Sequence, residues 1–527
     1  MSLGKNQLFY VDNYEILQKY IKDESIDLVY IDPPFNSKRN YNQIYNNIGN
    51  EDKAQAQAFV DTWEWNLRAE KDLKEILTGN NFTPQTIDLI IGLEKVLKKG
   101  TLLAYLTSMT LRINEMWRVL KPSGSFYLHC DPTASHYLKL LCDAIFTSRG
   151  GDFRNEIIWG YIGPSAAKKD FPKKHDTIFR YTKSDIFIFN SDNVRVPYSE
   201  GFIKRRKYSE GKAGIYAEKS QGRNENELQE FQKGKLPPSW WTDIKSGGQM
   251  PRGEHLGYPT QKPLALLERI ILASSNEGDT VLDAYCGCGT TVHASQKLNR
   301  NWIGIDITYQ SISLIIKRLE DSFGKESVKI NINDSKLPVS KENTENNTIQ
   351  VFGIPKDMEA AKALAHKEDD RVRKEFEKWA VLTYSNNRAM INDKKGGDGG
   401  IDGISRFPKT SLTDLGTVIF SVKSDKTINP AYIDQLAGTV ERNKADMGIL
   451  ICLNEPSKGA RQRADEYGTW NNPYNKSDYP KIQIVTIEEV VMQELRIDNV
   501  LAGVVLKQAV IDDYKTKQKS ILDEEIN

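Results

Sequence analysis

The chain has 527 residues, which at roughly 100–200 residues per domain indicates about three folded units. It carries 72 Lys and Arg against 71 Asp and Glu, a formal net charge of +1, and 39% of its residues are hydrophobic. This balance excludes a wholly basic architectural protein and an acidic disordered chain. It is compatible with nucleic-acid binding, because a basic patch can be local.

Signals for membranes and disulfides are missing from the sequence. No apolar run reaches the roughly 18 residues of a membrane span, and the N-terminus lacks the apolar core of a signal peptide. Five cysteines, an odd number without disulfide-like spacing, favour a reducing compartment, so we expect a cytoplasmic protein with no membrane partner. Cys286 and Cys288 lie too close together for a Cys-x-x-Cys zinc site.

The first predicted element is a buried strand over residues 26–31, a short apolar run. It is followed at once by Asp32-Pro33-Pro34-Phe35, and two prolines cannot continue a central strand, so a loop begins there. Further strands are expected at 125–129, 280–284 and 302–305, with helical patterns around them. This alternation predicts an α/β fold with a mostly parallel sheet and ligands at the carboxyl ends of its strands.

The middle of the chain is more basic than the rest. Residues 160–260 hold 18 Lys and Arg against 12 Asp and Glu, with aromatic residues interleaved. We interpret residues 160–255 as an insertion that divides the first domain into residues 1–159 and 256–331.

A second domain follows a polar segment. Residues 332–351 read as a linker. Beyond them, residues 356–384 are predicted as helical, residues 417–422 are a β-rich run, and residues 447–453 are a further apolar run. We therefore place a second, smaller α/β domain at 352–495. Residues 496–527 form a charged tail, predicted as helical from about residue 510.

The turn from Asp283 to Thr291 has the composition of a cofactor loop. Its glycines at 287 and 289 let a backbone approach a ligand closely. The helix that follows favours a negative group at its N-terminus, such as the carboxylate of a cofactor. Asp306, at the end of the next strand, is placed to accept hydrogen bonds from ribose hydroxyls. Taken alone, such a loop is equally compatible with a packing turn.

The Asp-Pro-Pro-Phe corner indicates chemistry on the exocyclic amine of a base. Such an amine is a poor nucleophile, because its lone pair is delocalised into the ring. Asp32 can accept one N–H and the carbonyl of Pro33 the other, which favours the pyramidal, nucleophilic form. Phe35 offers a face on which an extruded base stacks. Pro34 keeps the corner rigid. The alternative is a structural double-proline turn.

Together these motifs resemble those of the β-class amino-DNA methyltransferases, in which the catalytic motif precedes the motif for S-adenosylmethionine (AdoMet). The resemblance covers roughly residues 5–330. It implies a Rossmann-like methyltransferase sheet and makes residues 160–255 the target-recognition region. The matching stretches are Val11–Asn13, Ile31–Asn36, Leu120–Gly124, His129–Pro132, Tyr258–Pro263 and Asp283–Thr291.

The resemblance also implies roles for single residues. Asp12 would lie near the adenine of AdoMet, Lys262 near the cofactor site, and Asp306 on the ribose. Further cofactor contacts are implied at Asp283, Cys286, Gly287, Gly289 and Thr290. The chain departs from the family at Cys288, where Ser is frequent, and a small side chain is kept.

The expected substrate is adenine N6 in double-stranded DNA, in a restriction-modification or phage-defence system. Asp at the first position of the catalytic motif resembles the N6-adenine members, whereas N4-cytosine members more often have Ser. Methylation of cytosine N4 or of RNA, and a DNA-binding defence module with an inactive site, remain alternatives. A homodimer is compatible with the resemblance.

Several residues are candidates for contacts around the target base. Lys204, Arg205, Arg206 and Lys207 are either a phosphate-contacting cluster or a solvated loop. Trp240 and Trp241 read as local core rather than as a wedge between bases. His129 and Asp131 read as residues that shape the pocket rather than as a catalytic pair.

The second domain resembles the Mrr-like branch of the PD-(D/E)xK nucleases over roughly residues 356–455. Glu377, Asp402 and Lys423 supply the residue types for Mg²⁺-dependent phosphodiester cleavage, with Glu377 and Asp402 as metal ligands. Ser421 stands where an active member has Glu, Asp or Gln, and serine is a weaker Mg²⁺ ligand. An active nuclease and a degenerate module for DNA binding or dimerisation are the competing interpretations.

Overall fold

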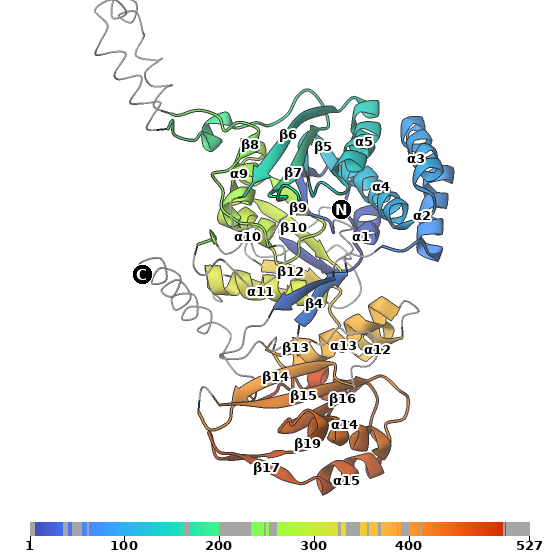
Figure 1. Ribbon diagram of the computed structural model, residues 1–527, viewed down its shortest axis with the longest axis vertical. Helices are drawn as coiled ribbons and strands as arrows, with labels where there is room; N and C mark the ends of the chain where they lie inside the picture. The colour runs from blue at the N-terminus through green and yellow to red at the C-terminus, as the bar shows by residue number, and fades with distance from the viewer. Residues whose placement is uncertain are drawn as a thin grey trace, which may run out of the picture.

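The computed structural model shows two main sheets, one in each half of the molecule (Figure 1). The structure describes residues 6–34, 40–44, 55–60, 63–161, 169–199, 233–246, 249–251, 254, 261–324, 328–333, 348–355, 358–366, 370–386, 388–391, 400–411, 414–498 and 501.

The larger sheet has ten strands. Seven neighbouring strands, from β11 (Lys329–Ile332) at one edge to β5 (Leu120–Cys130), all run parallel. β7 is antiparallel to both β5 and β6. The predicted mostly parallel α/β sheet is confirmed. In spatial order the strands are β11 (Lys329–Ile332), β12 (Thr348–Phe352), β1 (Gln7–Tyr10), β10 (Asn301–Asp306), β9 (Thr280–Asp283), β2 (Ile26–Ile31), β5 (Leu120–Cys130), β7 (His175–Thr182), β6 (Asp152–Gly160) and β8 (Trp240–Trp241).

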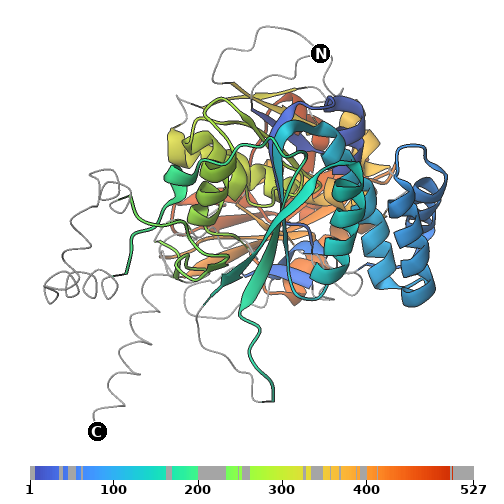
Figure 2. The ribbon, with the colours of Figure 1, turned by 90° about the horizontal axis from the view of Figure 1, so that it is seen from above.

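Two groups of helices cover the two faces of this sheet (Figure 2). Neighbouring strand residues point to opposite faces. Val29 packs in the cluster that contains the first group, whereas Leu28 and Tyr30 pack with α9. The first group is α1 (Asn13–Tyr20), α2 (Leu67–Thr78), α3 (Pro84–Leu97), α4 (Thr101–Val119) and α5 (Ser135–Phe146), and the second is α9 (Leu264–Ser274), α10 (Thr290–Lys297) and α11 (Tyr309–Phe323). A hairpin of β3 (Asn40–Ile44) and β4 (Gln55–Val60) and the 3₁₀ helices η1 (Thr147–Arg149) and η2 (Ser191–Val194) complete this half.

Three strands of the sheet, β12, β7 and β8, lie in segments predicted from the sequence as a linker or as an insertion. β12 falls at the end of the predicted linker 332–351, yet it pairs with β1 and buries Ile349 and Val351. β7 falls in the predicted insertion 160–255, yet it lies between β5 and β6. The apolar residues of β12 and β7 are few and are flanked by polar or basic sequence, so they do not stand out.

Residues 358–498, here named the C-terminal unit, contain a mixed five-stranded sheet. The predicted β-rich run at 417–422 is confirmed as part of β15, and the apolar run at 447–453 contains β16, which runs parallel to β15. The residues beyond 501, including the predicted helical tail, lie outside the described part. The sheet consists of β13 (Met390–Ile391), β14 (Gly403–Pro408), β15 (Leu415–Lys423), β16 (Met447–Cys452) and β19 (Ile482–Thr486), with α12 (Met358–Ala365), α13 (Asp370–Tyr384), α14 (Pro430–Arg442), α15 (Lys458–Glu466), α16 (Ile487–Met492) and the hairpin of β17 (Thr469–Asn472) and β18 (Ser477–Pro480) around it.

The two halves share one hydrophobic core. α13 of the C-terminal unit packs against α11, and one cluster joins Leu8 and Ile312 to Phe376 and Trp379. The C-terminal unit is therefore packed onto the larger sheet (Figure 1). Among the described residues, no helix combines the length and the apolar character that crossing a bilayer requires.

Candidate functional site

Three of the predicted site carboxylates follow neighbouring strands. β2 pairs with β9 and β9 with β10, all in parallel, so the carboxyl ends of these strands meet at one edge. Asp32 follows β2, Asp283 ends β9 and Asp306 ends β10. The charges of Asp32 and Asp306 both act on Asp283. The two motifs that the sequence singled out thus lie together.

The two oxygens of Asp32 have different surroundings. Oδ2 accepts a hydrogen bond from Lys262 Nζ at 2.5 Å. Oδ1 is buried and has no hydrogen-bond partner among the described residues. A buried acceptor without a donor is costly, so Oδ1 is an open position for a donor from outside the chain. Pro33 is buried beside it, and Phe35 lies outside the described residues.

Lys262 is fixed to the start of α10. Its side chain is 8% exposed, and its backbone carbonyl accepts from Thr290 Oγ1 at 3.1 Å. Arg318 Nη1 donates to the same Thr290 hydroxyl at 3.0 Å. Lys262 and Thr290, both predicted to contact a cofactor, are therefore also structural ties between the Asp32 corner and the glycine loop.

The glycine loop turns in the left-handed region of backbone conformation. Gly287 has φ 48° and Gly289 has φ 77°, and a Cβ on Gly289 would lie 2.6 Å from Ile315 Cγ1. Only glycine fits that position without strain. Cys286 is buried, and its N–H donates to the Ile305 carbonyl at 3.1 Å, which holds the loop against the end of β10.

The carboxylates next to this loop are hard to ionise. Burial raises the pKa of Asp283 to about 7 and that of Asp306 to about 6. Asp283 accepts from the Tyr285 N–H at 3.0 Å, and Asp306 from the Gly287 N–H at 2.9 Å. Asp306 Oδ1 also accepts two hydrogen bonds from Thr308, so the acceptor capacity that Asp306 keeps is on Oδ2. The loop therefore suits a ligand with an ammonium group and hydroxyl donors.

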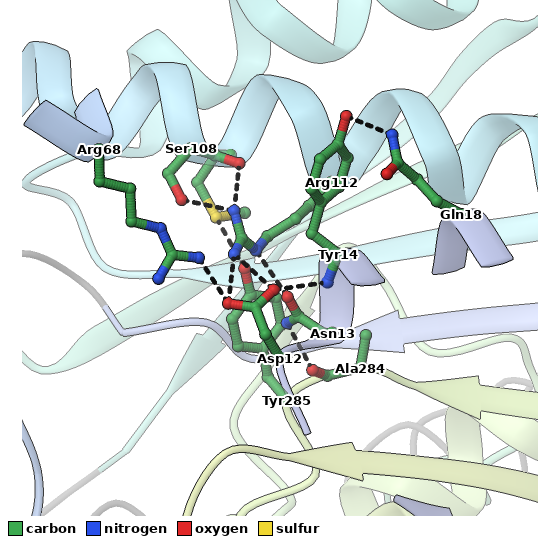
Figure 3. A network of polar contacts seen from close by, with 10 residues as sticks. Asp12, Asn13, Tyr14, Gln18, Arg68, Ser108, Arg112, Ala284 and Tyr285 are labelled. Atoms are coloured by element: carbon green, nitrogen blue, oxygen red, sulfur yellow. Dashed lines mark hydrogen bonds and ion pairs between the residues drawn. The ribbon is translucent and has the colours of Figure 1, made fainter. Parts of the chain in front are cut away.

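A buried polar network lies on the other side of the loop (Figure 3). Arg112, 5% exposed, donates to Asp12 Oδ1 at 3.1 Å and to Asn13 Oδ1 at 2.6 Å. Asn13 Nδ2 donates to the Ala284 carbonyl at 2.8 Å. Burial alone would raise the pKa of Asp12, but the charges of Arg112 and Arg68 outweigh it and lower the pKa to about 2. Asp12 is an ionised cap of α1 that is linked to the loop.

His129 pairs with an aspartate that the sequence reasoning did not select. Its Nε2 lies 3.1 Å from Asp176 Oδ2, and its Nδ1 lies 2.9 Å from Tyr30 Oη. Asp131 instead caps its own turn by accepting from the Thr133 N–H at 2.9 Å. Burial alone would raise the pKa of Asp176, but the hydrogen bond and charge of His129, followed by the charge of Lys262, lower it. His129 and Asp131 do not form a pair.

The predicted DNA-contacting residues are only partly described. Lys204, Arg205, Arg206 and Lys207 lie outside the described residues. Trp241 is buried and packs with α9, which fits the prediction of local core, whereas Trp240 is 64% exposed.

Of the nuclease-like residues, Asp402 is bonded to β15, the strand that carries Ser421 and Lys423. Asp402 Oδ2 accepts from the Val422 N–H at 2.6 Å, Ser421 is buried, and Lys423 ends β15. Glu377 lies on α13. The described residues contain no group of three or more His, Cys, Asp or Glu able to hold a metal ion. The predicted Mg²⁺ has no support from this arrangement.

Arg112, Asp176 and Arg318 were missed by sequence reasoning. Arg112 carried a usable signal, because it follows eleven uncharged residues at 101–111, and a lone charge after such a run needs partners if the segment is buried. Asp176 and Arg318 stand in ordinary mixed sequence and carried no such signal.

Comparisons with known proteins match both halves of the chain. The model of the DNA methylase family matches residues 26–317. The model described as NACHT-associated inactive Restriction Endonuclease 1 matches residues 372–492.

Curated relatives are similar to parts of this chain. Type II methyltransferase M.HpaI of Haemophilus parainfluenzae is 32% identical over 212 residues, which are 40% of this chain and 58% of that protein. Type II methyltransferase M1.MboII of Moraxella bovis is 32% identical over 40% of this chain and 78% of that protein. DNA adenine methyltransferase YhdJ of Escherichia coli K12 is 27% identical over 57% of this chain and 79% of that protein.

The chain spans little more than half the length of M.HpaI and of Type II methyltransferase M.BglII, at 58% and 57%. Among solved structures, a DNA modification methylase of Thermus thermophilus, TTHA0409, complexed with S-adenosyl-L-methionine, is 17% identical and covers 60% of this chain and 93% of that chain, with a TM-score of 0.32.

Proposed function

The chain belongs to the DNA methylase family, and from that premise we propose that it transfers a methyl group from AdoMet to adenine N6 in double-stranded DNA. We further propose that it is the site-specific methyltransferase of a restriction-modification or defence system. The observation that carries the proposal is the asymmetric carboxylate of Asp32, with one oxygen held by Lys262 and the other buried and open.

AdoMet suits the residues around the glycine loop. When bound, it supplies an electrophilic methyl group on a sulfonium. Asp283 and Asp306 offer acceptor oxygens for its ammonium group and its ribose hydroxyls, and the left-handed turn at Gly287 and Gly289 lets the backbone come close. Asp12 lies at the same edge, and the residue after it, Asn13, donates a hydrogen bond to the carbonyl of Ala284 in the loop.

Asp32 is the residue that acts on the substrate. Its Oδ1 accepts one N–H of the target amine and the carbonyl of Pro33 accepts the other, which localises the lone pair on the nitrogen. Transfer of the methyl group leaves one surplus proton on that nitrogen, and Oδ1 is the acceptor nearest to it. Lys262 keeps Oδ2 occupied, so the carboxylate presents its free oxygen in one orientation.

The proposed reaction requires the target base to leave the DNA duplex. Because the amine of a paired base is inside the duplex, the base is extruded into the site at a cost of a few kcal/mol. Lys204–Lys207 are proposed as phosphate contacts, so neutralising them would flatten the salt dependence of DNA binding. An unchanged slope would make them a solvated loop.

The C-terminal unit is proposed as a degenerate nuclease fold without its own cleavage activity. Ser421 stands at the position of a metal-binding carboxylate and is buried, and Asp402 holds the backbone of β15. The described residues offer no metal cluster around them.

Radiolabelled AdoMet tests the proposed function. Purified protein and mixed-sequence duplex DNA should give label in the DNA, and Asp32→Ala should give none. Failure of the wild-type protein to label any duplex would overturn the proposal. Label in cytosine N4 or in RNA would redirect it to those substrates.

A further inference from the structure

Glu375 of the C-terminal unit reaches into the methylase half. It lies on α13, outside the segment that matches the DNA methylase family, and is 8% exposed. Its Oε2 accepts from the Tyr309 N–H at 3.2 Å and from Tyr10 Oη at 3.5 Å. Its Oε1 lies 2.9 Å from Lys378 Nζ of the same helix. Both carboxylate oxygens are therefore engaged.

The position of Glu375 has a clear physical reason. Tyr309 is the first residue of α11, and its N–H has no acceptor within the helix. The helix dipole also places partial positive charge at this end, which favours a carboxylate. Glu375 thus caps α11 from another part of the fold, and Tyr10 and Tyr309 pack edge to face beside it, 5.8 Å between ring centroids.

Short contacts lead from Glu375 to the glycine loop. Thr308 precedes Tyr309, and its N–H and hydroxyl donate to Asp306 Oδ1 at 2.9 and 2.8 Å. Asp306 Oδ2 accepts from the Gly287 N–H at 2.9 Å. Tyr10, which also contacts Glu375, is the register partner of Asp306 between β1 and β10.

We propose that Glu375 is a positioning residue for the AdoMet site, so that the C-terminal unit completes the cofactor-binding half of the methyltransferase. By fixing the start of α11, Glu375 holds Asp306 and through it Gly287 in the geometry that binds the cofactor. This inference rests on the proposed function and adds a role for a segment outside the family match.

Calorimetric titration of AdoMet into the full-length protein tests the inference. Glu375→Gln keeps the size of the side chain but removes its charge, so we expect AdoMet affinity to fall about tenfold. The KM for AdoMet should rise in parallel, while kcat at saturating AdoMet stays within about twofold of wild type. Glu359→Gln, at an exposed carboxylate on α12, is the matched control and should bind like wild type.

The outcomes separate this inference from the proposed function. Wild-type AdoMet affinity in a folded Glu375→Gln protein, even with a lower melting temperature, would make Glu375 merely structural and overturn the inference alone. Absence of AdoMet binding by the wild-type protein would overturn the proposed function as well. Should Glu375→Gln fail to fold, Lys378→Met, which frees Oε1, is expected to weaken AdoMet several-fold, and unchanged affinity there would overturn the inference.

Discussion

Lys262 Nζ lies 2.5 Å from Asp32 Oδ2, although the two residues are 230 positions apart in the chain. The side chain of Lys262 is buried, and its backbone is tied to Thr290 at the start of α10. The pair therefore connects the corner that would act on the target base with the loop that would hold the cofactor. It also gives Asp32 one bound and one open oxygen.

Removing the carboxylate of Asp32 should separate turnover from cofactor binding. Asp32→Ala is expected to abolish methyl transfer and to change AdoMet affinity little, because the open oxygen faces the target amine. Transfer assays and calorimetry on the same preparation measure the two quantities. A parallel loss of AdoMet binding would contradict the role assigned to Asp32.

Replacing Lys262 tests whether it acts through Asp32. Lys262→Met keeps the length of the side chain and removes the ammonium, so the Asp32 carboxylate loses its fixed orientation. We expect kcat to fall about 10²-fold, with a smaller change in AdoMet affinity. The opposite split, in which affinity falls and kcat holds, would show that Lys262 serves the cofactor directly. Lys297→Met, at an exposed ion pair on α10, is the control.

Asp283 should make the stability of the ligand-free protein depend on pH. Burial raises its pKa from 3.8 to about 7. A raised carboxyl pKa contributes stability that is complete below pH 3.8 and is lost as the pH rises through about 7. Asp283→Asn removes this dependence, so its melting temperature relative to wild type should be higher at about pH 8 than at about pH 5. An equal difference at both pH values would show that Asp283 ionises normally.

Ionisation of Asp283 should also appear in cofactor binding. The ammonium group of AdoMet favours the charged carboxylate, so wild-type affinity is expected to rise between about pH 5.5 and 7.5. Calorimetry in two buffers with different heats of ionisation would detect the proton released on binding. Binding without proton release in this range would contradict the assignment.

Arg112 should matter for stability more than its single charge suggests. Arg112→Met removes the buried donor of Asn13 and one of the two arginine partners of Asp12, so we expect a loss of about 1–3 kcal/mol. Urea unfolding measures this loss. Lys19→Met, which breaks the exposed pair with Glu15, is the control and should change the free energy of unfolding far less, because the pair is screened by solvent. Similar losses for the two variants would show that the network does not hold α1 and α4 together.

Local signals in the sequence were sufficient for the ends of the central strands. An apolar run that stops at two prolines predicted Asp32 at the end of one strand, and an apolar run followed by glycines predicted Asp283 at the end of another. The partners of these residues depend on distant parts of the chain and carry no local signature. Asp176 contacts His129 from an antiparallel strand, and the basic sequence around that strand hides its pattern. Lys262 contacts Asp32 only once the sheet has formed.

At the boundary between the two halves, prediction from the sequence fails for a different reason. β12 follows a polar stretch typical of a linker, but its register with β1 is set by long-range pairing that composition does not encode. Glu375 likewise looks like any helical glutamate in the sequence, and its role comes from the helix that packs against it.

The C-terminal unit should not cleave DNA. Incubating the protein with unmethylated plasmid and Mg²⁺, with and without AdoMet, is expected to leave the plasmid intact, because Ser421 replaces a metal-binding carboxylate. Gel analysis of nicks and breaks gives the result. Cleavage that disappears in Lys423→Ala would make the protein a combined restriction and modification enzyme and would contradict the proposed degenerate fold.

Methylation of adenine is measured by nucleoside analysis with mass spectrometry, after the protein has been incubated with AdoMet and unmethylated duplex DNA. We expect N6-methyladenine in the wild-type reaction and none with Asp32→Ala. N4-methylcytosine, or no methylated nucleoside in a protein that binds AdoMet and DNA, would contradict this expectation.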